Sequence, residues 1–206
     1  MWFGKERNWL RWAACLLLLG GVIACTTQNP LDDYEALTPT TMMEAPDGDP
    51  AAAGQDPEAA AHGKYLVVLL GCGACHTDGA LIGQARQDRR LAGSQVGIAY
   101  SNPLEYKNPG VMFPSNLTPD PETGIGKLSD DQVVAAIREG LDRHGLQRLP
   151  VMPWPAYAKI SDDDINAILA YIRTLPPVRH EVPRNVLPGK KADSPFVHFG
   201  VYRSRR

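Results

Sequence analysis

Two cysteines and a histidine in the first half of the chain form the most specific chemical pattern in the sequence. Cys72 and Cys75 are three residues apart and His76 follows directly, which makes a C-x-x-C-H motif. This is the attachment motif for c-type haem. On a helical turn, residues three apart share one face, so both sulfurs can bond the haem vinyl groups while the imidazole reaches the iron. The motif predicts one covalent haem c, with its iron, on Cys72, Cys75 and His76.

Two other functions of a C-x-x-C pair compete with this interpretation. A zinc site needs two further ligands at comparable spacing, and the sequence has no second C-x-x-C pair. A redox dithiol of the thioredoxin type needs a βαβ context, which the sequence pattern does not indicate. A purely structural protein would leave the motif without a role. We therefore keep the haem interpretation.

The second axial ligand of the iron must be chosen among several residues. Met152 lies in a Pro-rich segment, residues 149–155, whose restricted backbone angles can hold a thioether over the iron. We predict Met152 as this ligand, with Met112 as the rival and core packing as the other common role of a methionine. The other histidines, which are more often surface residues than ligands, are His62, His144, His180 and, as the strongest alternative among them, His198.

The N-terminal residues have the features of an export signal. Lys5, Arg7 and Arg11 precede an apolar stretch at residues 12–24 that is short for a membrane-spanning helix. Cys25 closes a pattern that resembles a bacterial lipoprotein box, so we predict cleavage before it and its lipidation. An uncleaved signal anchor and ordinary signal peptidase cleavage nearby are the alternatives. The prediction places the protein on the periplasmic side of a bacterial membrane, attached through the lipid.

Composition excludes two other classes of protein. Of the four cysteines, Cys15 is removed with the signal and Cys25 is used by the lipid, which leaves no disulfide framework. The 206 residues have a formal net charge of -2, and removal of the basic signal makes it more negative. Nothing in this charge indicates a nucleic acid partner.

Three helices are predicted around the motif. The first, over residues 56–71, begins with Asp-Pro and leads directly into the motif. The second, over residues 129–144, begins with a capping-box spacing. The third, over residues 161–175, begins at a serine cap, has apolar residues at i, i+3, i+4 and i+7, and is followed by proline.

The predicted organisation has four parts. Residues 1–24 are the signal peptide, and residues 25–55, rich in Pro, Thr, Ala, Asp and Gly, are a flexible acidic tether. Residues 56–180 form the domain, whose Gly- and Pro-rich middle requires a large apolar cofactor to fill it. Residues 181–206 form an extended basic tail, whose cations are solvated or contact an acidic partner or anionic lipid: Arg184, Lys190, Lys191, Arg203, Arg205 and Arg206.

Several motifs together resemble class I cytochromes c. The resemblance is specifically to the haem domains of the cytochrome c subunits of membrane-bound bacterial alcohol, gluconate and aldehyde dehydrogenases, and it spans about residues 57–178. The segments that carry it are CGACH at residues 72–76, SNLTPD at 115–120, ETGIG at 122–126, MPW at 152–154 and AYIRTLP at 170–176. Those subunits have several such domains in tandem, whereas this sequence has one C-x-x-C-H motif.

The resemblance implies an all-α fold, a single class I cytochrome c domain with long haem-wrapping loops. It implies Met152 as the axial ligand and places Asn116 and Thr118 where they could donate hydrogen bonds to the haem. It also implies that the first and last helices cross near Gly63, Tyr65, Leu169 and Tyr171.

The function that follows is an electron carrier rather than an enzyme. A haem iron with both axial positions taken by protein side chains passes single electrons with little rearrangement. The redox proteins that donate and accept these electrons are unknown. One alternative is a fixed electron-transfer subunit of a membrane dehydrogenase or oxidase complex. Another, from a different class, is a haem enzyme or gas sensor with an open sixth site.

Overall fold

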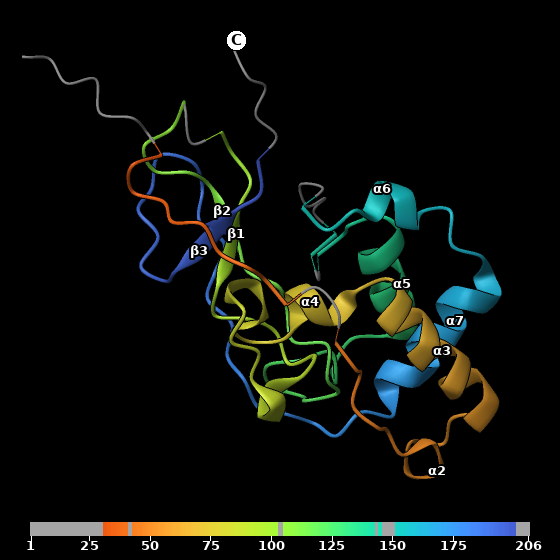
Figure 1. The fold of residues 1–206 in the computed structure, drawn as a ribbon. Coiled ribbons are helices and arrows are strands. Elements are labelled where there is room, and N and C mark those ends of the chain that lie inside the picture. Colours follow the sequence, from red (N-terminus) through yellow and green to blue (C-terminus); the bar gives the residue numbers. More distant parts are fainter. Residues whose placement is uncertain (1–30, 41–42, 103–104, 143, 146–150, 201–206) are drawn as a thin grey trace, which may run out of the picture. The chain divides into compact units, whose positions relative to one another are not determined.

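The computed structural model describes residues 31–40, 43–102, 105–142, 144–145 and 151–200. The chain divides into two units, Met1–Asp33 and Tyr34–Arg206, and the architecture below is that of the second unit (Figure 1). No helix in these described ranges is long and apolar enough to cross a membrane. Cys25 and the predicted signal peptide lie outside the described residues.

The predicted starts of the two principal helices are confirmed. Helix α3 spans Pro57–Leu69 and is capped by Asp56, whose side chain accepts the N–H of Ala59 at 2.8 Å. Helix α7 spans Asp162–Arg173 and is capped by Ser161, whose hydroxyl accepts the N–H of the residue three positions on at 3.1 Å. Such caps satisfy backbone donors that the helix itself cannot pair.

Helices α3 and α7 cross in close contact, as the resemblance implied. A Cβ atom at Gly63 would overlap the carbonyl oxygen of Ala167, so only glycine permits this approach. Tyr171 and Leu169 are buried at the crossing. Tyr65 is not part of it, because its side chain is 60% exposed. On α3 it lies two residues from Gly63, and a helix turns about 200° in two residues, which directs Tyr65 outward.

Two shorter helices, α5 and α6, lie between the two principal ones in the sequence. Helix α5, Asp130–Arg138, begins with the predicted capping box between Ser129 and Gln132. It ends earlier than expected, because Gly140 has a left-handed backbone with φ of 68°. Helix α6, Trp154–Tyr157, begins within the Pro-rich segment.

A small sheet corrects the expectation of an all-α fold. Strands β1 (Gly97–Ala99), β2 (Val111–Met112) and β3 (Phe196–His198) have the order β2-β1-β3. β1 is antiparallel to β2, with Ile98 opposite Met112, and parallel to β3. The strands have two or three residues, too few for the alternating pattern by which a sequence reveals a strand. In Figure 1 the haem-motif helix α4 (Cys72–His76) lies between this sheet and helices α3, α5 and α7.

The segments before and after the helical core pack on it. Residues 43–55, assigned by composition to a tether, contain helix α2 (Pro50–Ala53). The hydroxyl of Tyr171 donates to the carbonyl of Pro46 at 2.6 Å, and the N–H of Asp49 donates to the carbonyl of Thr174 at 2.9 Å. The tail likewise contributes β3 to the sheet rather than being an isolated arm. Two 3-10 turns, η1 (Ala80–Ile82) and η2 (Gln87–Arg89), lie between α4 and β1.

Candidate cofactor site

The C-x-x-C-H motif forms a short helix of its own. Gly71, with φ of 69°, separates α3 from α4 and turns the chain so that α4 begins at Cys72. Left-handed backbone of this kind favours glycine. Cys72, Cys75 and His76 are all partly buried, and the two thiols are not joined in a disulfide. The local geometry therefore keeps both sulfurs and the imidazole on one helical turn.

A backbone hydrogen bond orients the imidazole of His76. Its Nδ1 lies 2.7 Å from the carbonyl oxygen of Ser115. A carbonyl oxygen only accepts, so Nδ1 carries a proton, and in the neutral ring Nε2 then has the lone pair. This tautomer is the one that presents Nε2 as a ligand to a metal, with the second nitrogen held by an outer partner.

Two adjoining hollows lie beside α4, with volumes of about 140 and 280 Å³. Apolar side chains of α3, α5 and α7 line the first, and residues of β1, β2 and α6 border the second. Together they fall within the size range of small-molecule and cofactor sites. The residues common to both linings are Leu70, Cys72, His76, Ser115, Ala136, Met152 and Tyr157.

The two methionines proposed as ligands both lie at these hollows. Met152 borders both of them, whereas Met112 borders the larger one. Met112 belongs to strand β2, where its position is fixed by pairing with Ile98. Met152 lies in the irregular segment just before α6 and its side chain is partly buried.

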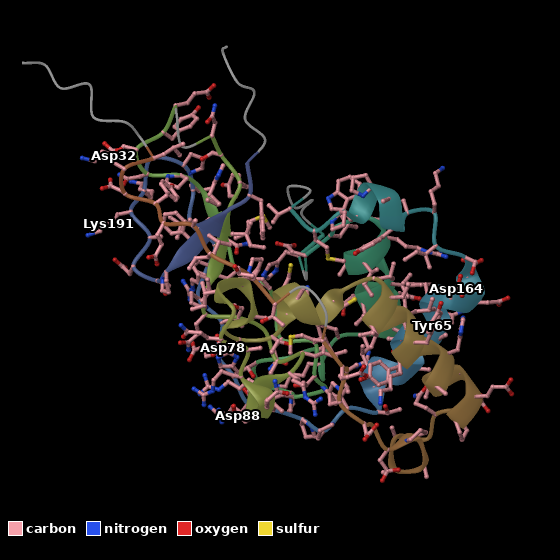
Figure 2. All side chains as sticks on the ribbon, viewed as in Figure 1. Asp32, Tyr65, Asp78, Asp88, Asp164 and Lys191 are labelled. Carbon is pink, nitrogen blue, oxygen red and sulfur yellow. The ribbon has the colours of Figure 1, made fainter. Side chains whose placement is uncertain are left out.

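The described histidines outside the motif have other surroundings. The Nε2 atom of His62 lies 2.8 Å from Oδ1 of Asp164, and its ring stacks on that of Tyr65. Figure 2 shows the labelled Tyr65 and Asp164 on the outer side of α3 and α7. His180 is buried and its Nδ1 donates to the carbonyl of Ala92 at 2.9 Å. Among the described histidines, His76 borders the two hollows, and His62, His144, His180 and His198 do not.

The environment of the thiols does not suit the competing interpretations. Burial raises the pKa of the Cys72 thiol to about 11 and also raises the pKa of the Cys75 thiol. A redox dithiol depends on a stabilised thiolate, and burial of these two thiols favours the neutral form instead. Within the described ranges, no group of three or more His, Cys, Asp or Glu side chains is placed to hold a metal ion.

The polar loop after Ser115 is held by hydrogen bonds of Asn116 and Thr118 within the protein. Asn116 accepts the hydroxyl hydrogen of Thr118 at 2.7 Å, and its amide donates to the carbonyl of Val178 at 2.8 Å and to the hydroxyl of Thr123 at 3.1 Å. These bonds attach the loop to the chain that follows α7. Asn116 also borders the smaller hollow, and Thr118 does not.

Two residues of the site were not selected from the sequence. Ser115 orients His76 through its carbonyl, and its place at the start of the SNLTPD segment was the available signal. Tyr157 borders both hollows, its hydroxyl donates to the carbonyl of Leu70 at 3.4 Å, and burial raises its pKa. A main-chain carbonyl carries no sequence signature, so neither contact could be inferred from residue type.

The residues around α4 fit a covalently attached haem. Apolar walls, two sulfurs on one helical turn and an imidazole held through its Nδ1 are the features that such a group requires. The sequence profile of the cytochrome c family matches residues 60–176, which is more than half of the chain. The chain belongs to the cytochrome c family. Membership implies a covalently bound haem c with its iron, and a function in electron transfer.

Relatives of this cytochrome c include subunits of several dehydrogenases. The chain is 34% identical over 149 residues to the fructose dehydrogenase cytochrome subunit of Gluconobacter japonicus, covering 72% of this chain and 28% of the relative. It is 39% identical over 124 residues to the cytochrome c subunit of the quinone alcohol dehydrogenase of Gluconobacter oxydans, covering 59% and 23%. The gluconate 2-dehydrogenase cytochrome c subunit of Pantoea cypripedii is 35% identical over 109 residues, covering 53% and 21%.

These matches confirm the resemblance to dehydrogenase cytochrome subunits. The matched part spans about a quarter of the length of each of these relatives. The similarity therefore establishes a shared cytochrome c domain.

Proposed function

We propose that this cytochrome c carries one haem c, joined by thioether bonds to Cys72 and Cys75, with His76 and Met152 as axial ligands. The observation that carries the proposal is that Cys72, His76 and Met152 border the same two hollows, on the sides of α4 and of the segment before α6. The tautomer of His76, set by Ser115, supports its role as one ligand.

Two further observations favour Met152 over Met112 as the other ligand. Met152 borders both hollows and Met112 borders one, so Met152 is nearer to the region that the hollows share. Met112 is also held in strand β2 by its pairing with Ile98, whereas Met152 lies outside the helices and strands. A thioether opposite an imidazole favours a relatively high reduction potential.

In electron transfer, the protein holds the haem and shields it from water. A bound haem c supplies a one-electron ferric–ferrous couple. Val67, Ile168 and Ile172 line the smaller hollow and exclude water from it, which keeps the local dielectric low. With His76 and Met152 as the two protein ligands, the iron would have no position left for a substrate. This arrangement is that of a carrier rather than of a haem enzyme or a gas sensor.

We place this carrier at the periplasmic side of a bacterial membrane, held by a lipid on Cys25, which lies outside the described residues. Its donor and acceptor are redox proteins. The named relatives are cytochrome subunits of dehydrogenases, which favours a second form of the proposal, a fixed electron-transfer subunit of such a complex. Co-purification of a dehydrogenase with the tagged chain from membranes would support the fixed subunit, and isolation of the chain alone would support the mobile carrier.

The ligand proposal is tested by visible spectroscopy of the wild type and of Met152→Ala, with Met112→Ala as the matched control. We expect low-spin c-type bands in the wild type, together with the weak ferric charge-transfer band of a methionine–iron bond. That band should be lost in Met152→Ala and retained in Met112→Ala. The reverse pattern would assign the ligand to Met112, and a band absent from the wild type would exclude methionine.

Carbon monoxide separates the carrier from the sensor. The reduced wild type should bind carbon monoxide slowly or not at all at neutral pH, because Met152 holds the sixth position. Reduced Met152→Ala should bind it readily. Rapid binding by the wild type would overturn the carrier and support an enzyme or sensor. Mass spectrometry of the mature protein gives the number of covalent haems and the modification of Cys25 in the same preparation.

A further inference from the structure

The Ser115 carbonyl that holds the His76 imidazole lies on a segment without regular secondary structure. We name residues 114–118 the ligand loop; they follow strand β2 and precede helix α5. Neither a helix nor a strand fixes the backbone of Ser115, so other hydrogen bonds must set the direction of its carbonyl. Because this carbonyl accepts the Nδ1 proton of His76 at 2.7 Å, those bonds also set the orientation of the imidazole.

Main-chain hydrogen bonds hold the ligand loop before and after Ser115. The carbonyl of Pro114 accepts the N–H of Ser94 at 3.0 Å, and the N–H of Leu117 donates to the carbonyl of Leu91 at 2.9 Å. Ser94 and Leu91 both belong to the segment between the C-x-x-C-H motif and strand β1. These bonds give the loop a first attachment, to the part of the chain that follows the motif.

Two side chains give the ligand loop a second attachment, to the chain that follows α7. Asn116 donates its amide to the carbonyl of Val178 at 2.8 Å, and the hydroxyl oxygen of Thr118 accepts the N–H of Val178 at 3.1 Å. The side-chain oxygen of Asn116 accepts both the N–H and the hydroxyl of Thr118, at 2.9 and 2.7 Å. Both main-chain groups of Val178 are therefore bound by two side chains that also bind each other.

The attachment to Val178 is buried. Asn116 is 2% exposed and Thr118 is 1% exposed. A buried donor or acceptor that loses its partner has no water to replace it, so the loop must shift to restore the bond. The hydroxyl of Thr118 serves two neighbours at once, because it donates to Asn116 and accepts from Val178. Its removal loosens both contacts.

Thr118 lies outside the lining of the cofactor site. Ser115 borders both hollows and Asn116 borders the smaller one, whereas Thr118 borders neither. A change at Thr118 therefore leaves the side chains around the haem the same. Any effect on His76 must pass through the ligand loop and the carbonyl of Ser115.

We propose that Thr118 is a positioning residue for His76: with Asn116 it fastens the ligand loop to Val178 and so fixes the carbonyl that accepts the Nδ1 proton. The inference rests on the proposed ligation of the iron by His76 and adds what controls it. A firm hydrogen bond from Nδ1 makes the imidazole a more basic ligand. A more basic ligand favours ferric iron, so a loosened loop raises the reduction potential.

The first test is the reduction potential of the holoprotein with Thr118→Val, which keeps the shape of the side chain without its hydroxyl. At the midpoint potential of the wild type, we expect the ferric-to-ferrous ratio of the variant to be about threefold lower, which corresponds to about 30 mV at 59 mV per tenfold for one electron. Thr118→Ser retains the hydroxyl and should keep the wild-type potential. Spectroelectrochemical titration measures all three proteins.

A second readout reports on the hydrogen bond itself. In ferrous holoprotein labelled with ¹⁵N-histidine, the Nδ1 proton of His76 should exchange with deuterium several-fold faster in Thr118→Val than in the wild type. Tyr171→Phe is the matched control, since it also removes a hydroxyl that bonds to a main-chain carbonyl, but from a residue that borders neither hollow and does not contact the ligand loop. It should change neither the potential nor this exchange.

The unmutated protein gives a measurement that does not depend on the folding of a variant. The Nδ1 proton of His76 and the N–H of Val178 should have similar protection factors, because detachment of the loop releases both. Far weaker protection at His76 would show that its bond breaks while the loop stays attached, which would overturn the positioning role.

The outcomes separate this inference from the proposed function. A low-spin c-type spectrum in the wild type, with neither potential nor exchange altered in Thr118→Val, would overturn the role of Thr118 and leave the ligation by His76 intact. Equal shifts in Thr118→Val and Tyr171→Phe would assign the effect to lost stability and also overturn that role. A wild type without the low-spin spectrum would overturn the ligation itself.

Discussion

At the scale of single residues, Asp120 orders a loop that borders the cofactor site. Its carboxylate accepts the N–H of Thr123 at 2.6 Å, the hydroxyl of Thr123 at 2.8 Å and the N–H of Glu122 at 3.1 Å. These bonds to the charged form, led by the Thr123 N–H, lower the pKa of Asp120. Thr123 and Gly124 line the smaller hollow, so the carboxylate fixes part of its wall.

The lowered pKa of Asp120 gives a prediction with a defined sign. A carboxyl whose pKa is lower in the folded than in the unfolded chain, where it is about 3.9, stabilises the fold above that pH. This contribution is lost as the pH falls through the folded pKa. Asp120→Asn should therefore be less stable than the wild type at pH 7, and the difference should shrink at pH 3. Urea midpoints by circular dichroism measure both.

Asp193→Asn is the control for this change, since Asp193 is an exposed carboxylate after the core. Its effect should stay within about 0.5 kcal/mol at both pH values. A difference between wild type and Asp120→Asn that is the same at pH 7 and pH 3 would exclude the ionised carboxylate as the cause.

At the scale of elements, the crossing helices α3 and α7 form part of the wall of the smaller hollow. Val67 of α3 and Ile168 and Ile172 of α7 are buried and line the smaller hollow. Their positions depend on how closely the helices approach at Gly63. Because the obstructing atom is the backbone oxygen of Ala167, a side chain at position 63 cannot be accommodated by a rotamer change.

Gly63→Ala should therefore separate the helices and destabilise the protein by about 2 kcal/mol or more, as an overpacked core does. The gain in helix propensity from glycine to alanine, about 1 kcal/mol, opposes this but does not offset it. The measurement is the free energy of unfolding in urea. Ala61→Ser, an exposed change on the same helix, should have an effect within about 0.5 kcal/mol. A Gly63→Ala variant as stable as the wild type would show that the crossing is looser than described.

The segment before α3 is attached to α7 by a hydrogen bond and to α3 by an ion pair. The buried Tyr171 donates its hydroxyl to Pro46, and Lys64 of α3 pairs with Asp47 at 2.6 Å. The pair is exposed on the Asp47 side, so solvent screens it. The tyrosine hydroxyl is the stronger link because it is buried.

Tyr171→Phe removes this hydroxyl and should cost about 1 kcal/mol at pH 7. Burial raises the pKa of Tyr171 above its ordinary value near 10. A raised pKa means that the unfolded chain ionises first, so this contribution is present below pH 10 and is lost as the pH rises further. The wild type should thus lose more stability than Tyr171→Phe between pH 8 and pH 11. Tyr65→Phe, on an exposed ring, is the control and should match the wild type at both values.

At the scale of the whole molecule, both ends of the described chain extend beyond the segment that matches the family. The match covers residues 60–176, while helix α2 and strand β3 lie outside it. Val197 of β3 packs against Leu81, Val96 and Ile98, which form a second apolar cluster beside the motif. The tail therefore contributes to the stability of the fold.

A chain that ends at Lys191 lacks β3 and should be less stable than one that ends at Gly200. Loss of the partly buried Val197 and of the pairing with β1 should cost about 1 to 2 kcal/mol. The comparison is made by urea unfolding and by the visible spectrum of the holoprotein. Equal stability of the two chains would show that β3 does not contribute to the fold.

Local signals in the sequence determined much of this cytochrome. Caps at Asp56, Ser129 and Ser161 act over three residues, and the structure confirms all three helix starts. The C-x-x-C-H motif acts over five residues and predicts its chemistry without reference to the rest of the chain. The family resemblance is confirmed, and the assignments of Cys72, Cys75, His76 and Met152 remain predictions that the proposed spectra test.

Tertiary structure decided what depends on residues far apart in the chain. The Ser115 carbonyl meets His76 across 39 positions, and β3 pairs with β1 nearly a hundred residues before it. These contacts use main-chain atoms, which are the same in every residue, and strands too short to show a period. The sequence therefore predicted the cofactor and the helices, while the sheet, the packing of residues 43–55 and the orientation of the imidazole became evident only in the folded chain.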